Sequence, residues 1–312
     1  MAGVSALADP VVAFAPRGRV ERLAALRDSL AMTKPEVNLL VAITTAAAFA
    51  LGAAASRAPF PWMRFFETLA GTVLVASGAA ALNQWMERGF DARMRRTARR
   101  PVAAGRIDPS LALALGALLS LAGVAILLCA VGGLPSFLAA ATLLGYLFLY
   151  TPAKRRTPLC TVIGAIPGAV PPLIGWAAAR GRLDPEAWVL YAILFIWQFP
   201  HFMAIAWLYR DDYDRAGYAV LPRGEGRGRF VALQTMLPLL ALAFTSLLPV
   251  VAGRGGALYA IGALVLNLGF LARGAQFALR RSAPAARALL SASVLHLPML
   301  LGLMVIAQWA GR

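Results

Sequence analysis

Residues 65–91 read FFETLAGTVLVASGAAALNQWMERGFD, an apolar run that ends in a polar motif. The apolar part, 65–83, is close to the length of about 20 residues that a helix needs to cross the hydrocarbon core of a membrane. Asn83, Glu87 and Asp91 are spaced four apart, so on a helix they lie on one face, drifting by about 40° per step. The stretch therefore predicts a membrane helix whose end presents one amide oxygen and two carboxylates together.

The composition of the whole chain is that of a membrane protein. Its 312 residues are 60% hydrophobic and only 14% charged, with a mean hydropathy of +0.70. A water-soluble protein of this length could not bury so much apolar surface, and the charged residues cluster between long apolar runs. We expect an all-α, polytopic membrane helical bundle, because a backbone in lipid must satisfy its own hydrogen bonds.

The apolar runs predict nine transmembrane helices. With boundaries good to several residues, these lie at 37–55, 65–83, 109–130, 133–152, 159–178, 186–207, 230–251, 257–274 and 288–308. If the N-terminus is cytoplasmic, 24 of the 30 Lys and Arg residues fall on the cytoplasmic side. The positive-inside rule thus predicts a cytoplasmic N-terminal segment, 1–32, followed by a transmembrane domain, 33–312.

The net charge of +16 has a simple explanation in a membrane protein. Nucleic-acid binding would be the alternative interpretation of such an excess of positive charge. The positive-inside bias and contact with anionic membrane lipid account for most of the charge, so we expect no nucleic-acid partner.

Two long charged loops are predicted, at 84–108 and 208–229, each after the second helix of a group of four. Each loop carries an acidic motif beside its basic residues. This placement predicts a pseudo-repeat of four plus four helices with the ninth added. If the two halves face each other, the two acidic motifs converge at the cytoplasmic mouth of a central cavity.

The second acidic motif, at 209–215, reads YRDDYDR. Carboxylates from two motifs are suited to a shared Mg²⁺ ion, which prefers oxygen ligands and commonly bridges carboxylates to phosphate oxygens. The alternative is that both loops are merely solvated and form internal ion pairs.

Arginines follow the first motif directly, among them Arg95 and Arg96. Guanidinium groups bind phosphate through paired hydrogen bonds. Carboxylates for a hard cation beside guanidiniums for phosphate predict a site for a metal-bound diphosphate. Because the site lies at a membrane surface, we expect the diphosphate to carry an apolar tail.

Three further features each allow a functional and a structural interpretation. Lys154 follows the fourth span, where it either orients the protein in the membrane or contacts phosphate. His201 lies within the sixth span, where an ionisable residue is either functional or a hydrogen-bonded packing residue. The glycines and prolines of 164–175 interrupt the fifth span, where they either line a cavity or permit close packing.

Several stretches together carry a resemblance to a known group. They are 83–91 with MRRT at 94–97, TKP at 33–35, KRRTP at 154–158, GAVPPLIGW at 168–176, PHF at 200–202 and YRDDY at 209–213. The chain resembles the UbiA superfamily of intramembrane prenyltransferases, and within it the branch that farnesylates protohaem IX. Two positions depart from the pattern. Glu87 stands where the family commonly has Asp, and Gly89 where many members carry another acidic residue. The second motif also differs from the Asp-x-x-x-Asp of the wider superfamily, and within it Asp212 is the first candidate ligand, Asp211 the second and Asp214 the last.

The resemblance implies a fold of the UbiA type and a reaction. A farnesyl group would pass from farnesyl diphosphate to a vinyl group of protohaem IX with addition of water, giving haem O and diphosphate for haem–copper oxidase cofactor synthesis. The implied location is the bacterial inner membrane, with the site at the cytoplasmic side. A haem A synthase is the implied candidate partner protein.

The resemblance also assigns roles to residues. The implied cofactor is Mg²⁺, with Mn²⁺ as the alternative, and the implied catalytic and metal-binding residues are Asn83, Glu87, Asp91, Asp211 and Asp212. The implied substrate-binding residues are Lys34, Arg95, Arg96, Lys154, Arg210, Tyr213 and His201. For His201 the expected contact is with haem, as an axial ligand or as a proton-handling group.

Other functions remain alternatives at this point. A prenyltransferase acting on a quinone precursor is the nearest, and the stretch 154–176 argues against it. A transporter or channel is compatible with the broken fifth span, although transport does not require the paired carboxylates, and a membrane scaffold is the least specific alternative. The sequence leaves open the oligomeric state, the orientation of haem and whether 223–229 acts as a lid.

Overall fold

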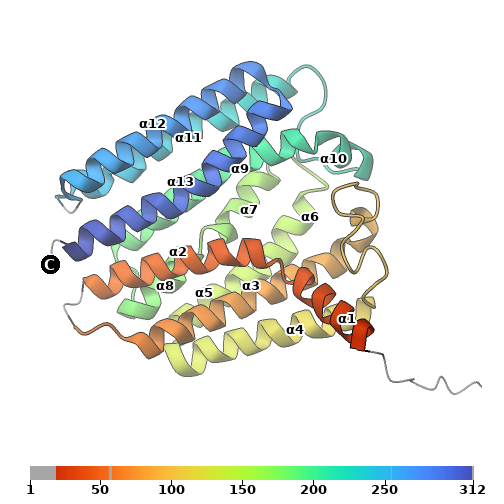
Figure 1. Cartoon of the computed structure of the whole chain (residues 1–312), viewed down its shortest axis with the longest axis horizontal. Helices are drawn as coiled ribbons and strands as arrows, with labels where there is room; N and C mark the ends of the chain where they lie inside the picture. Colours follow the sequence, from red (N-terminus) through yellow and green to blue (C-terminus); the bar gives the residue numbers. More distant parts are fainter. Residues whose placement is uncertain (1–18, 56–57, 254, 311–312) are drawn as a thin grey trace, which may run out of the picture.

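The protein is described by a computed structural model, in which residues 19–55, 58–253 and 255–310 are placed (Figure 1). Residues 1–18 of the predicted N-terminal segment lie outside these described residues. The helices are α1 (Arg19–Met32), α2 (Pro35–Ala54), α3 (Trp62–Asp91), α4 (Pro109–Ile126), α5 (Gly133–Leu144), α6 (Thr151–Ala153), α7 (Cys160–Gly168), α8 (Pro171–Arg180), α9 (Pro185–Leu208), α10 (Arg210–Ala216), α11 (Arg227–Val251), α12 (Gly256–Arg280) and α13 (Ala283–Ala310). Single π-helical turns, η1 (Leu127–Val131) and η2 (Gly145–Tyr150), continue α4 and α5.

The predicted all-helical membrane bundle is confirmed. Within the described residues, nine stretches are long and apolar enough to cross a membrane, and each overlaps one predicted span. Large apolar side chains such as Leu121, Phe148 and Leu268 are exposed on these spans, where lipid would cover them. The chain is therefore a multi-pass membrane protein.

The second span differs from its prediction. The sequence suggested that the helix ends near residue 83 and that a loop begins at 84, but α3 runs without a break to Asp91. Asn83, Glu87 and Asp91 therefore occupy the last turns of a helix, and all three are buried. Polar side chains are tolerated there because each finds hydrogen-bonding partners on neighbouring segments.

The fifth span is interrupted, as its glycines and prolines suggested, and it forms α7 and α8 with a break between them. Close packing accounts for its glycines. A side-chain carbon at Gly175 would lie 2.1 Å from the carbonyl oxygen of Thr45 on α2, and one at Gly164 would lie 2.5 Å from the ring of Tyr150. Small residues at these positions let the helix backbones approach each other.

The helices form two groups that meet where α2 packs against α13 and where α8 packs against α9 (Figure 1). One group contains α2, α3, α4 and α5, and the other contains α11, α12 and α13. The segment between α3 and α4 lies beside α10 at the same end of the bundle. We call this the carboxylate end, because α3 finishes there with Asp91 and α10 follows α9 there.

Glycines on α3 and α4 hold these two helices unusually close. A side-chain carbon at Gly78 would lie 2.1 Å from the hydroxyl oxygen of Ser120 and 2.6 Å from the carbonyl oxygen of Gly116. About two helical turns away along the same interface, a side-chain carbon at Gly123 would lie 2.5 Å from the carbonyl oxygen of Gly71. These contacts fix the helix that carries the polar motif against its neighbour.

We expect Gly78→Ala to lower the free energy of unfolding by about 1–3 kcal/mol, because the added methyl group overpacks this interface. Thermal unfolding in detergent micelles measures the effect. The matched control is Gly89→Ala on the same helix, where nothing lies within 4 Å of the added carbon. That change should leave the unfolding temperature equal or slightly higher. Equal unfolding temperatures for Gly78→Ala and the wild type would show that the two helices separate readily.

Candidate active site

The first polar motif forms one buried face at the end of α3. Asn83, Glu87 and Asp91 are 1%, 5% and 1% exposed. The amide nitrogen of Asn83 donates to Glu87 Oε2 at 2.9 Å and to the hydroxyl of Thr151 at 3.2 Å. The four-residue spacing therefore places these side chains together as predicted, and Thr151 at the start of α6 supports them.

Of the two carboxylates on this face, Glu87 has more side-chain partners. The ammonium of Lys154, just beyond α6, lies 2.7 Å from its carboxylate. The hydroxyl of Tyr218, beyond α10, donates to Oε1 at 2.9 Å. Three segments that are far apart in the sequence thus meet at one carboxylate.

The buried side chains of Asn83, Glu87 and Asp91, with the side chains that contact them, are called the carboxylate cluster below. Two lysines from the first half of the chain face it. Lys34 adopts a left-handed backbone conformation with φ 53°, which is uncommon for a residue with a side chain, and its Nζ lies 3.4 Å from Asn83 Oδ1. Desolvation, together with the positive charges of Arg100 and Lys154, lowers the pKa of Lys34 from 10.5 to about 7. Desolvation also lowers the pKa of Lys154, although Glu87 opposes the shift. Both ammonium groups would therefore gain from the arrival of an anion.

Asp91 forms an ion pair with Arg100 that involves both of its carboxylate oxygens. Arg100 Nη1 lies 2.8 Å from both carboxylate oxygens of Asp91, and the hydroxyl of Thr97 donates to the Asp91 carbonyl at 2.9 Å. Both partners come from the segment that follows α3, which consequently folds back over the end of the helix. This brings the guanidinium of Arg100, one of the arginines that follow the first motif, into the cluster.

Through Asp212 the second motif reaches the segment that follows the first motif. The Asp212 side chain is 10% exposed, and it accepts hydrogen bonds from the backbone N–H of Arg96 at 3.1 Å and from Arg215 at 2.8 Å. The guanidinium of Arg96 contacts the Tyr213 hydroxyl at 3.3 Å and lies over the ring of Tyr209. The two acidic motifs thus adjoin each other at the carboxylate end.

Asp211 and Arg210 lie apart from this cluster. The side chain of Asp211 is 78% exposed and forms an ion pair with Arg210 at 3.6 Å. Arg210 in turn donates to the carbonyl of Trp207 and lies over its ring. Neither residue contacts the buried carboxylates through any interaction seen in the described part of the chain.

The remaining predicted residues also lie outside the cluster. Arg95 is exposed. His201 contacts the hydroxyl of Ser293 on α13 through Nδ1 at 2.8 Å, and its ring stacks on Trp197. This is the environment of a hydrogen-bonded packing residue, and the expected haem contact stays a prediction.

The segment 223–229 is only partly a loop, because α11 begins at Arg227. The guanidinium of Arg227 forms an ion pair with Asp214 at 2.9 Å and donates to the carbonyl of Pro222. Asp214, the last-ranked metal ligand, is therefore used to attach α10 to the start of α11.

Tyr218 and Thr151 are the members of the cluster that sequence reasoning missed. Both are uncharged and lie beside motifs that drew attention for their charges. The signal for Tyr218 was its position directly after Gly217 in the second charged loop, because a left-handed glycine turns the chain back toward the preceding helix. Thr151 offered no signal beyond its nearness to Lys154.

The donor set of the cluster fits a hard cation. Its carboxylates and amide oxygen are the ligands that Mg²⁺ prefers, and Mg²⁺ is commonly bound by one or two carboxylates together with substrate phosphates. Within the described ranges, no group of three His, Cys, Asp or Glu side chains lies close enough to hold a metal ion on its own.

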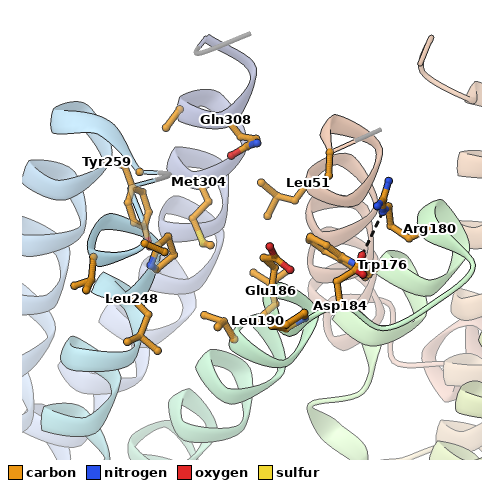
Figure 2. Close-up of a pocket in the computed structure, with 18 of the residues that line it drawn as sticks. Leu51, Trp176, Arg180, Asp184, Glu186, Leu190, Leu248, Tyr259, Met304 and Gln308 are labelled. Carbon is orange, nitrogen blue, oxygen red and sulfur yellow. Dashed lines mark hydrogen bonds and ion pairs between the residues drawn. The ribbon is translucent and has the colours of Figure 1, made fainter. Parts of the chain in front are cut away.

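A separate cavity of about 880 Å³ opens at the end of the bundle opposite the carboxylate end (Figure 2). Apolar side chains such as Leu190 and Met304 line most of it. On one side Asp184 accepts hydrogen bonds from Trp176 at 3.2 Å and Arg180 at 3.3 Å. None of the residues that line this cavity belongs to the carboxylate cluster, so the cavity lies outside the chemistry argued from it.

Comparison with known proteins gives consistent relationships. The sequence model of the UbiA prenyltransferase family matches residues 41–301. A protein of Solibacter usitatus named protoheme IX farnesyltransferase is 47% identical over 287 residues, which cover 90% of this chain and 98% of the relative. The resemblance predicted from the motifs is thereby confirmed.

Solved structures show the same fold. A UbiA homologue from Aeropyrum pernix K1 aligns with a TM-score of 0.68 and 21% identity, covering 85% of this chain and 96% of that one. A UbiA homologue from Archaeoglobus fulgidus bound to GPP and Mg²⁺ aligns with a TM-score of 0.56 and 14% identity, covering 89% and 99%. The predicted fold class is confirmed by these likenesses.

Proposed function

Because this chain belongs to the UbiA prenyltransferase family, we propose that it transfers a farnesyl group from farnesyl diphosphate to a vinyl group of protohaem IX. The allylic C–O bond breaks, the farnesyl carbon bonds to the vinyl group, and water supplies the hydroxyl group. Haem O and diphosphate are the products, and the proton of the captured water is released.

One observation carries this proposal. Buried carboxylates from both halves of the chain, Glu87, Asp91 and Asp212, lie at one end of the bundle among cations. Buried charges are costly, and proteins retain them where they are paired or functional. Each of these carboxylates already pairs with a positively charged side chain of the protein. The carboxylates therefore suit a metal ion, and the positive side chains beside them suit the anion bound to that ion.

The cations of the cluster would bind the diphosphate. Lys34 and Lys154 have lowered pKa values because they are desolvated, and a diphosphate would supply further negative charge beside them. Arg100 can offer its guanidinium to phosphate oxygens while it remains beside Asp91. The chain thereby orients the leaving group at the carboxylate end and directs the apolar tail into the bundle.

Asn83, Glu87, Asp91 and Asp212 would hold Mg²⁺, with Mn²⁺ as the alternative. The bound ion would supply charge neutralisation that makes diphosphate a better leaving group. Asp211 is the weaker candidate of the second motif, because its side chain is exposed to solvent. Asp212, by contrast, is already buried beside positively charged side chains, so it could bind a metal ion without leaving its present surroundings.

The location and partners follow from the same proposal. The excess of Lys and Arg on the side of the carboxylate cluster supports a cytoplasmic site in a bacterial inner membrane. Protohaem IX, an apolar ring with acidic substituents, would enter from the lipid side. A haem A synthase is the proposed partner that would receive the product.

The test is an assay of membranes with protohaem, farnesyl diphosphate and Mg²⁺, with products identified by mass. We expect a haem species heavier by farnesyl plus water, lost when the metal is chelated and restored when Mg²⁺ is added back. Transfer of farnesyl to an aromatic acid or quinol instead would support the quinone-type alternative. Absence of diphosphate release with every acceptor would contradict the proposal.

A further inference from the structure

Tyr218 is the only residue of the second half that hydrogen-bonds to Glu87 within the described residues. Its side chain is 3% exposed, and its hydroxyl donates to Glu87 Oε1 at 2.9 Å. The other partners of this carboxylate both come from the first half: Asn83 donates to Oε2, and the ammonium of Lys154 lies 2.7 Å from both oxygens. One hydrogen bond from Tyr218 therefore links the two halves at the proposed site.

The backbone around Tyr218 holds its ring in place. Gly217, with φ 79°, ends α10 in a left-handed conformation and turns the chain back. The N–H of Tyr218 then donates to the carbonyl of Tyr213 at 2.9 Å, and the N–H of Ala219 donates to the carbonyl of Lys154 at 2.8 Å. The backbone next to Tyr218 is thus hydrogen-bonded to the residue whose ammonium pairs with Glu87.

The phenol differs chemically from the ammonium that shares Glu87 with it. Lys154 carries a mobile positive charge on a flexible stem, so an arriving diphosphate will attract it. Tyr218 is a neutral phenol, so an arriving diphosphate does not draw its hydroxyl away from the carboxylate to which it donates. The phenol can therefore keep its hydrogen bond to Oε1 of Glu87 while Lys154 turns toward the phosphate, as the neutral amide of Asn83 can keep its own to Oε2.

We propose that Tyr218 is a positioning residue of this site, which holds the Glu87 carboxylate in the orientation that receives metal-bound diphosphate. The inference rests on the proposed function, because it assumes that Glu87 serves a metal-bound diphosphate. It explains why a Glu at position 87 is useful, since its extra methylene lets the carboxylate reach the second half. An Asp at this position would fall short of the phenol.

The experiment uses Tyr218→Phe in the full-length protein in detergent. Binding of farnesyl diphosphate is measured by calorimetry with Mg²⁺ and without acceptor, so that no turnover occurs. We expect about 10-fold weaker binding, the usual loss when a residue that orients a metal ligand is removed. Without Mg²⁺ the variant and the wild type should bind farnesyl diphosphate equally, because the phenol acts through a metal ligand.

Tyr259→Phe is the matched control for a purely structural effect. Tyr259 is also a buried tyrosine, and its hydroxyl donates to the carbonyl of Ser246 at 2.5 Å, at the end of the bundle opposite the carboxylate cluster. Its removal should lower the unfolding temperature and leave the affinity for farnesyl diphosphate unchanged. An equal loss of affinity in both variants would overturn the positioning role.

A second background separates positioning from direct contact. In Glu87→Asp the carboxylate no longer reaches the phenol, so adding Tyr218→Phe should change the affinity less than twofold. The same 10-fold loss in both backgrounds would show that Tyr218 does not act through Glu87. If the wild type binds no farnesyl diphosphate, the proposed function itself fails, whereas wild-type binding that Tyr218→Phe leaves unchanged contradicts this inference alone.

Discussion

Asp91→Asn should reduce turnover of farnesyl diphosphate and protohaem roughly 1,000-fold, the scale of losing one charged group that stabilises a developing charge. The side chain keeps its shape but loses the charge that would hold a metal ion. It also leaves the guanidinium of Arg100, 2.8 Å away, without its counter-charge. The measurement is the rate of haem O formation at saturating Mg²⁺, with the unfolding temperature recorded for the same preparation.

The matched control for this change is Asp28→Asn. Asp28 on α1 forms a bidentate ion pair with Arg106, whose Nε and Nη2 donate to the two carboxylate oxygens at 2.9 and 3.0 Å. That pair lies outside the carboxylate cluster and is more exposed, so its loss should change turnover by less than about twofold. If Asp91→Asn retained more than a tenth of the wild-type rate, its carboxylate would not belong to the metal site.

The second large effect is expected at the other motif, where two adjacent aspartates differ in orientation. Asp212→Asn should lower turnover roughly 100-fold or more, because its buried carboxylate lies beside Arg96 at the junction of the two motifs. Asp211→Asn should leave turnover within about threefold, because its side chain is mostly exposed and its pair with Arg210 is a surface interaction.

The two variants change one oxygen for one nitrogen at neighbouring positions, so each serves as the control for the other. Initial rates across a Mg²⁺ titration give the measurement. A rise in the Mg²⁺ concentration needed for half-maximal rate should accompany Asp212→Asn alone. The opposite ranking would mean that α10 turns when substrate binds, bringing Asp211 inward.

Much of the fold and part of the candidate site could be predicted from the sequence alone. Apolar runs of membrane-spanning length required a helical bundle, because lipid offers no hydrogen bonds to an open backbone. The four-residue spacing of Asn83, Glu87 and Asp91 required them to share one helix face, provided that the helix continued, and it does. The motifs of both charged loops, together with the stretches at 33–35, 154–176 and 200–202, were sufficient to identify the family.

The tertiary structure decided what local patterns could not. The sequence places Asp211 and Asp212 side by side, and only the packing of α10 against the segment after α3 selects Asp212 as the buried one. Likewise Tyr218 meets Glu87 across more than a hundred residues. Local spacing determines which side chains share a helix face, whereas contacts between distant segments depend on how whole helices pack, which no short stretch specifies.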